Sequence, residues 1–350
     1  MKPIDITALI VAQLNCPVEL AVPINIKGAP RIGKSGCVKT ACKQAGARLF
    51  DVRLSTIQDV DISGLPHFWT DADGRTFSEF AWPAVFPKPG CGPTVLLFDE
   101  LDKGLPSTMN AALGVIYDRQ IHGHRLPDSV RLVACSNRTT DKAHSQRLGN
   151  AMSPRWTNVD FEFDLNNFLG WWLENNLPAE IPAFLKFRHH LLSTATGAKE
   201  KGFAYEFDAT SEEDSFPAPA TWEYVARLMQ QGLPTKIFDE LVRKTVGNAA
   251  AIEFLAFLKI AKSLPSIEEI RYAPMTATLP EEPSARYAAA GMLARRMTPA
   301  TAPQFVQYLD RLGKAFSAYG VSAAGQRDGS LWQEQALQQW SHRNQKIVFA

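Results

Sequence analysis

Residues 28–35 read Gly28-Ala29-Pro30-Arg31-Ile32-Gly33-Lys34-Ser35, and Gly36 follows. This stretch has the complete pattern of a phosphate loop, G-x-x-x-x-G-K-[ST], in which each fixed position has a separate physical role. The glycines allow backbone N–H groups to turn inward around a phosphate, where a Cβ would obstruct them. Lys34 brings a cation to the β- and γ-phosphates, and the Ser35 hydroxyl is placed to ligate Mg²⁺. Residues 28–36 are therefore expected to bind a nucleotide.

The residues on both sides of the loop fit a strand–loop–helix unit. Val22, Ile24 and Ile26 alternate with other residues, as expected for a strand that ends just before the loop. Residues 34–45 follow as a predicted helix, whose N-terminus favours a bound anion. The alternative, a chance match in a glycine-rich turn, leaves these flanking patterns unexplained.

The composition is that of an ordinary globular protein. The chain has 350 residues, enough for a well-buried core and two domains, and a formal net charge of +1. Bulk charge therefore points to neither nucleic acid nor a membrane surface. The N-terminus has no signal pattern and no apolar run approaches ~20 residues, so we expect a cytoplasmic protein. Its five cysteines form no CxxC pair and are expected to be buried, reduced thiols: Cys16, Cys37, Cys42, Cys91 and Cys135.

The first 163 residues alternate between strand and helix patterns. Strands are expected at residues 22–27, 47–54, 94–99, 130–136 and 157–163. A helix is expected over residues 106–120, with Pro106 near its start. The apolar run in 94–99 suggests a strand that is covered on both faces, as in a parallel sheet. This alternation predicts an α/β fold with a doubly wound parallel sheet.

From about residue 165 helical patterns dominate. Helices are expected at 165–176, 181–192, 221–232, 235–246, 248–263, 284–297, 303–318 and 330–345. Residues 194–219 are polar and contain prolines, so we expect a loop there, and the proline-rich residues 264–283 are expected to be a linker. The predicted domains are therefore an α/β nucleotide-binding domain (1–163), an α-helical lid domain (164–270) and a C-terminal helical extension (284–350).

An acidic pair follows a buried strand directly. Val95 to Phe98 are apolar and run into Asp99 and Glu100. Acids at the end of a buried strand are costly unless they face a site with cations, and ligands bind at this edge of a parallel sheet. We expect Asp99 to hold Mg²⁺ through its water shell and Glu100 to polarise the attacking water. The alternative is a strand end with two solvated acids.

The next strand ends in Ser136-Asn137-Arg138. An amide at this neighbouring strand tip can orient water against the γ-phosphate. Asn137 is therefore a candidate catalytic residue, although asparagine also closes turns well, and that alternative stays open.

These motifs together resemble an AAA+ ATPase, and most closely the MoxR branch of that superfamily. The resemblance rests on the phosphate loop, on residues 96–102 (Leu-Leu-Phe-Asp-Glu-Leu-Asp) and on residues 135–138, which follow in the family's order and spacing. Residues 51–66 resemble the segment that leads into the family's insert, and 118–128 resemble its hairpin before sensor 1. The similarity covers about residues 20–270.

The resemblance implies roles for individual residues. Lys34 and Ser35 correspond to Walker A, Asp99 and Glu100 to Walker B, and Asn137 to sensor 1. Arg155, in Met152-Ser153-Pro154-Arg155-Trp156, aligns with the arginine finger that reaches the nucleotide of the adjacent subunit. Such a finger is worth on the order of 10³–10⁵ in rate in related NTPases. A surface salt bridge is the alternative for Arg155.

Three further sequence features bear on this assignment. Arg147 is a second, weaker candidate at the same subunit interface. In Pro217-Ala218-Pro219-Ala220, the family's sensor 2 arginine is replaced by Ala220, so bidentate coupling of the lid to the γ-phosphate is lost unless Arg227 substitutes for it. Aromatic residues gather around the loop at 71–75, which by the same resemblance touches a client or a partner.

The resemblance implies a ring-forming ATPase, in a hexamer, that uses ATP and Mg²⁺ to remodel or mature a protein client. A partner with a von Willebrand factor A domain is implied by the same resemblance. One alternative is a nucleotide-gated assembly scaffold with little hydrolysis, which would fit Ala220. Another is a nucleic-acid motor, which the near-neutral charge disfavours. His122 and His124 lack acidic or cysteine neighbours in sequence, so we expect a hairpin tip there rather than a metal site.

Overall fold

The computed structural model describes residues 1–138, 152–192, 215–262 and 264–344. The chain divides into two compact units between Phe163 and Asp164. The expected boundary between a lid and a C-terminal extension, at residues 271–283, stays a prediction.

The first unit is built on a five-stranded parallel sheet with the strand order β2-β5-β8-β1-β9. The strands are β1 (Ile24–Lys27), β2 (Arg48–Arg53), β5 (Thr94–Asp99), β8 (Val130–Ser136) and β9 (Thr157–Asp160). The expected α/β class, with a parallel sheet and a helical C-terminal part, is confirmed. The last strand ends at Asp160 rather than at residue 163.

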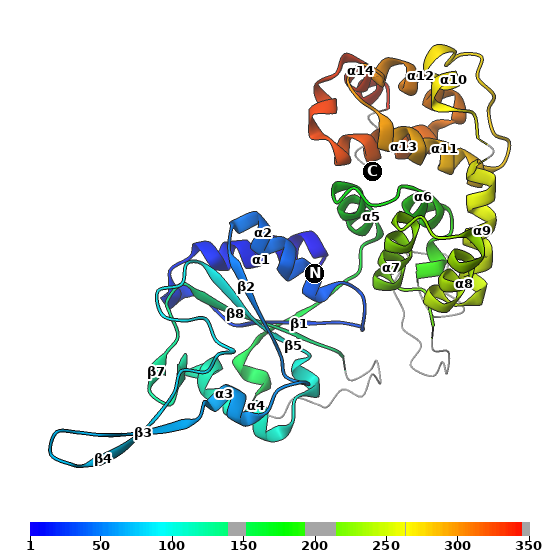
Figure 1. The fold of residues 1–350 in the computed structure, drawn as a ribbon. Helices are drawn as coiled ribbons and strands as arrows, with labels where there is room; N and C mark the ends of the chain where they lie inside the picture. Colours follow the sequence, from blue (N-terminus) through cyan, green and yellow to red (C-terminus); the bar gives the residue numbers. More distant parts are fainter. Residues whose placement is uncertain (139–151, 193–214, 263, 345–350) are drawn as a thin grey trace. The chain divides into compact units, whose positions relative to one another are not determined.

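Helices cover both faces of this sheet (Figure 1). Helices α1 (Pro3–Asn15) and α2 (Lys34–Ala45) lie over one face, and α3 (Asp59–Ser63) and α4 (Pro106–Tyr117) lie over the other. Strand β5 is buried on both faces, as its continuous apolar run requires. On the side of α4, Leu96 and Phe98 belong to a core that also contains Trp156.

Two hairpins pack together beside the sheet. Strands β3 (Pro66–Thr70) and β4 (Thr76–Phe80) form an exposed hairpin, and β6 (Gln120–Ile121) and β7 (His124–Arg125) form a short one. The Phe80 ring stacks on His122 with 4.0 Å between centroids, and His124 Nε2 lies 2.6 Å from the Phe80 carbonyl oxygen. The expected hairpin tip at these histidines is therefore present, and the described residues contain no His/Cys/Asp/Glu cluster suited to a metal ion.

The second unit is helical throughout its described residues. Its helices are α5 (Leu165–Glu174), α6 (Glu180–Phe187), α7 (Pro219–Gln230), α8 (Thr235–Val246), α9 (Asn248–Lys262), α10 (Ile267–Tyr272), α11 (Pro283–Arg296), α12 (Ala302–Leu312), α13 (Lys314–Arg327) and α14 (Gln335–Arg343). Trp222 packs against Phe184 and Phe254 in its core, with ring centroids 5.6 and 5.2 Å away. Within the described ranges, the helices are too short or too polar to cross a bilayer.

Three expectations for the second unit are corrected. The predicted helix 303–318 is two helices, because Gly313, with φ +109°, ends α12 and begins α13. The predicted linker 264–283 contains helix α10, which Ser266 caps through the Glu269 N–H. The predicted helix 330–345 is split into a 3₁₀ turn, Gly329–Gln333, and α14. The expected loop 194–219 lies outside the described residues up to residue 214.

Gly64, between α3 and β3, gives a direct test of the hairpin's attachment. Its φ of +79° and ψ of 171° are open almost only to glycine, and a Cβ there would lie 2.3 Å from the Ala81 carbonyl oxygen. We expect Gly64→Ala to destabilise the first unit by about 1–3 kcal/mol, measured by thermal unfolding. Gly74→Ala is the control, since Gly74 also has a positive φ but open space around it. Equal melting temperatures for both variants would contradict this account.

Candidate functional site

The phosphate loop runs from the end of β1 into α2. Arg31 and Gly33 have positive φ angles, 61° and 100°, so the chain turns sharply before the helix begins at Lys34. A Cβ on Gly28 would lie 2.8 Å from an Ile32 side-chain carbon and 2.9 Å from Phe161 Cβ. Only glycine therefore fits at the first position of the loop.

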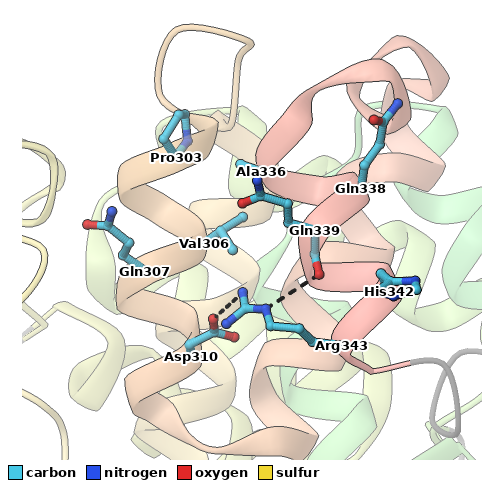
Figure 2. Close-up of a pocket in the computed structure, with 9 residues that line it drawn as sticks. All are labelled: Pro303, Val306, Gln307, Asp310, Ala336, Gln338, Gln339, His342 and Arg343. Atoms are coloured by element: carbon cyan, nitrogen blue, oxygen red, sulfur yellow. Dashed lines mark hydrogen bonds and ion pairs between the residues drawn. The ribbon is translucent and has the colours of Figure 1, made fainter.

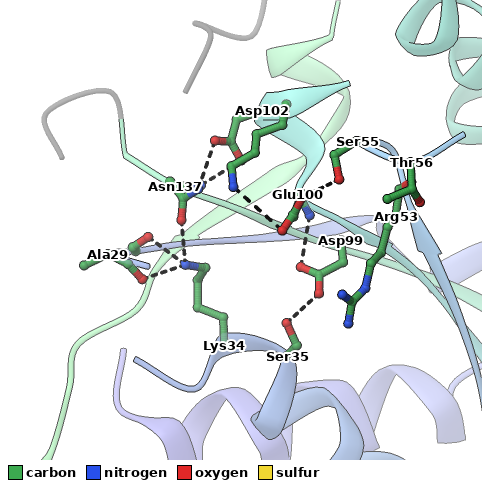
Figure 3. A network of polar contacts seen from close by, with 12 residues as sticks. Ala29, Lys34, Ser35, Arg53, Ser55, Thr56, Asp99, Glu100, Asp102 and Asn137 are labelled. Carbon is green, nitrogen blue, oxygen red and sulfur yellow. Dashed lines mark hydrogen bonds and ion pairs between the residues drawn. The ribbon is translucent and has the colours of Figure 1, made fainter. Parts of the chain in front are cut away.

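Lys34 is turned toward the loop and the neighbouring strand tip. Its side chain is 8% exposed, and Nζ donates to the carbonyl oxygens of Gly28 and Ala29, at 2.8 and 2.7 Å. Nζ also donates to Asn137 Oδ1 at 3.1 Å (Figure 3). The loop lysine and the predicted sensor residue are thus in direct contact, although 103 residues separate them in the sequence.

Ser35 and Asp99 are also brought together. The Ser35 hydroxyl donates to Asp99 Oδ2 at 2.9 Å, across from the loop to the end of β5. Partial burial and then the nearby negative charge of Asp99 raise the pKa of Asp51 above its usual value. The Ser35 hydroxyl and the Asp99 carboxylate are oxygen ligands of the kind that Mg²⁺ prefers. The Asp51 carboxylate adds negative charge beside them.

Glu100 lies at the turn after β5, with φ 55°. The Ser55 hydroxyl donates to the Glu100 Oε2 (Figure 3). Lys103 Nζ lies 3.7 Å from the Glu100 Oε1. The carboxylate is about one-third exposed, so water can reach it. Ser55 follows β2, the strand beside β5, and its position next to Glu100 was not expected from the sequence.

Asp102 is the residue whose role the sequence did not indicate. It is 1% exposed, and both of its carboxylate oxygens accept from Asn137: Oδ1 from the backbone N–H at 2.9 Å and Oδ2 from Nδ2 at 3.1 Å. These bonds fix the Asn137 amide so that its oxygen faces Lys34. A weak signal existed, since Asp102 recurs three residues after Asp99 just beyond a buried strand.

Arg155 lies on a separate turn. This turn, η4 (Ser153–Arg155), precedes β9, and the guanidinium of Arg155 stands over the Tyr117 ring, 5.0 Å from its centroid. Arg147 lies outside the described residues. Ala220 is the second residue of α7 in the helical unit, and Arg227 on the same helix forms an ion pair with Glu223. The first unit therefore brings together Lys34, Ser35, Asp99, Glu100 and Asn137.

Three of the five cysteines are buried, and two are not. Burial raises the pKa of Cys37 to about 12 and that of Cys42 to about 11, and it raises the pKa of Cys135 as well. These thiols stay protonated at neutral pH and cannot act as nucleophiles. Cys16 and Cys91 are only partly buried, which corrects the expectation for them.

A hollow in the second unit does not carry comparable chemistry. It has a volume of about 730 Å³ and lies between α12 and α14 (Figure 2). Glutamine side chains line much of it, with one ion pair of 3.0 Å between Arg343 and Asp310. Its residues include neither a phosphate loop nor paired acids.

The chain is similar to known proteins only at a low level among those found. No protein-family model matches the sequence, and no curated protein matches it. Solved structures of RuvB variants from Thermotoga maritima are similar, with 12% sequence identity and a TM-score of 0.35, over 77% of this chain and 77% of theirs in one case. The RuvB Holliday junction branch migration motor of the same organism has 11% identity and a TM-score of 0.33, over 75% of this chain and 76% of its own. Similarity at this level assigns no activity.

The contact between Asp102 and Asn137 predicts a stability effect. Asp102→Asn replaces one acceptor oxygen by an NH₂ group, so one Asn137 donor loses its partner in a buried place. We expect a loss of about 1–3 kcal/mol in the free energy of unfolding, measured by thermal or urea unfolding. Asp73→Asn, at an exposed turn, is the matched control and should leave stability unchanged. An Asp102→Asn protein as stable as the control would show that the contact contributes nothing.

Proposed function

We propose that the chain is an Mg-ATP-dependent AAA+ ATPase of the MoxR type, which forms a ring and acts on a protein client. The observation that carries this proposal is the convergence of Lys34, Ser35, Asp99, Glu100 and Asn137 at the carboxyl edge of one parallel sheet. Ligands bind at this edge in open α/β folds. The motif resemblance supports the assignment to the family.

In the proposed reaction the phosphate loop binds the nucleotide. Its backbone N–H groups and Lys34 would hold the phosphates, while the N-terminus of α2 favours their negative charge. Ser35 and Asp99, which lie 2.9 Å apart, would hold Mg²⁺. When bound, the ion neutralises charge that develops on the phosphates.

Glu100 and Asn137 act on the attacking water. Glu100 accepts its proton as general base, which is worth about 10²–10⁴-fold in rate. Asn137 orients the water, and Asp102 keeps its amide in one orientation. Ser55 and Lys103 contact the Glu100 carboxylate. Glu100 accepts a proton from water more readily when these contacts are released.

Arg155 completes the site of the adjacent copy in this proposal. A guanidinium supplied by a neighbour stabilises charge in the transition state, so hydrolysis requires assembly into a ring, here a hexamer. The exposed β3–β4 hairpin carries Phe68, Trp69 and Phe77, which are 73%, 45% and 41% exposed. Such side chains suit contact with a client or with a partner that has a von Willebrand factor A domain.

A second candidate is a nucleotide-gated scaffold that assembles with ATP and hydrolyses it little. Ala220 favours this candidate, because it carries no guanidinium where the family has its sensor 2 arginine. Arg227, the possible substitute, is engaged with Glu223. The two candidates differ in turnover, not in nucleotide binding.

The first test of the proposal is the loop lysine. Lys34→Ala removes the cation from the phosphate site, and we expect ATP binding, measured by calorimetry, to weaken beyond detection. Lys39→Ala is the matched control, since Lys39 is exposed on the same helix. This variant should bind ATP with the affinity of the unmodified protein. Unchanged affinity in Lys34→Ala would rule out the phosphate-loop assignment.

The second test separates the ATPase from the scaffold. Glu100→Gln is nearly isosteric but cannot accept a proton, so it should bind ATP and assemble while turnover falls by about 10²-fold or more. Assembly is followed by light scattering with and without Mg-ATP, and turnover by phosphate release. If the unmodified protein assembles with ATP yet releases no phosphate, the scaffold replaces the ATPase. A hydrolysis rate in Glu100→Gln equal to that of the unmodified protein would remove the base role.

A further inference from the structure

A line of hydrogen bonds crosses three strands on the α4 side of the sheet. Ser136 Oγ on β8 donates to Asn25 Oδ1 on β1 at 3.0 Å, and Asn25 Nδ2 donates to Asn158 Oδ1 on β9 at 3.0 Å. We call Ser136, Asn25 and Asn158 the asparagine ladder. Asn25 is 0% exposed and stands between Ile24 and Ile26 on β1, the strand between β8 and β9. A buried amide in this place is costly unless its partners are fixed, so it specifies the pairing of its neighbours.

One end of the ladder lies at the nucleotide site. Ser136 directly precedes Asn137, and the Ser136 carbonyl oxygen accepts from the Gly28 N–H at 3.2 Å. The ladder therefore begins where the phosphate loop meets the strand that carries Asn137.

The other end lies at the turn that carries Arg155. Asn158 Nδ2 donates to the carbonyl oxygens of Ser153 and Trp156, both at 3.2 Å. These two carbonyls flank Arg155 in the sequence, so one amide group clamps the turn on both sides of it. The Trp156 ring packs edge-on against Phe98, 6.2 Å between centroids, at the end of β5.

We propose that Asn25 and Asn158 are positioning residues for Arg155. The ladder holds the η4 turn in register with the phosphate loop, so that each subunit presents its arginine to the neighbouring site in a geometry set by its own nucleotide-binding strand. This inference rests on the proposed function, in which Arg155 acts on the adjacent copy. It differs from a purely structural role because its effect falls on the neighbour's turnover.

The first measurement uses Asn158→Ala. Removing the clamp displaces Arg155, and we expect turnover to fall about 10- to 100-fold, because small misplacements of a catalytic group have effects of this size. ATP affinity should be unchanged, since the subunit's own phosphate loop is intact. Asn158→Asp keeps the acceptor for Asn25 but loses the donor to the two carbonyls, so it should show the same loss even if Asn158→Ala folds poorly. Thr157→Ala, on the same strand but outside the ladder, is the matched control.

The second measurement is complementation between subunits. Asn158→Ala subunits are mixed in equal amounts with Lys34→Ala subunits, which bind no ATP but carry an intact Arg155 turn. In rings of random composition, half of the nucleotide sites belong to Asn158→Ala subunits and can bind ATP. Half of these sites lie next to a Lys34→Ala subunit, which supplies an intact Arg155 turn. Turnover should therefore recover to about a quarter of the unmodified value, which is more than either variant gives alone.

Arg155→Ala mixed with Lys34→Ala is the reference. If that pair recovers activity and the Asn158→Ala pair does not, the positioning role is overturned while the proposed function stands. Turnover in both Asn158 variants equal to that of Thr157→Ala would also overturn it. If the Arg155→Ala pair itself fails to recover, the arginine finger assignment fails first, and the inference fails with it.

Discussion

The register of β8 between β1 and β5 is the constraint on which the rest of the site depends. Because the three strands are parallel, the loop after β1, the acidic pair after β5 and Asn137 after β8 reach the same edge of the sheet. A slip of one residue in β8 would turn Asn137 away from Lys34. It would also move each side chain of β8 to the opposite face of the sheet. The burial of all seven β8 residues makes such a slip costly, so the core holds the chemistry in place.

Much of the α/β unit could be predicted because its signals are local. The phosphate loop has fixed residues at fixed spacing, and strands such as β5 are continuous apolar runs that few other structures accommodate. The acidic pair is informative because charge at the end of a buried strand needs an explanation. These features required no knowledge of which strands are neighbours.

The remaining contacts could not be predicted because they depend on which residues the fold places side by side. Ser55 meets Glu100 only because β2 pairs with β5, and Asp102 meets Asn137 across 35 residues of sequence. The sequence does not predict the break between α12 and α13 at Gly313, because the helical spacing of apolar residues continues through it. Only the positive φ of Gly313 in the structure shows the turn. Arg131 is buried, and its Nε donates to the Gln13 carbonyl oxygen of α1. This hydrogen bond holds α1 in place, and no sequence motif predicts it.

The Asp102–Asn137 contact also has an evolutionary consequence. A single substitution at either position leaves the other residue's polar atoms buried without their partner, and such an intermediate is penalised by selection. The two positions are therefore expected to change together or to stay fixed, even though 35 residues separate them. In a set of diverged relatives, this pair would behave as one inherited unit, whereas an exposed pair such as Asp73 and Arg75, at 72% exposure each, could change one residue at a time.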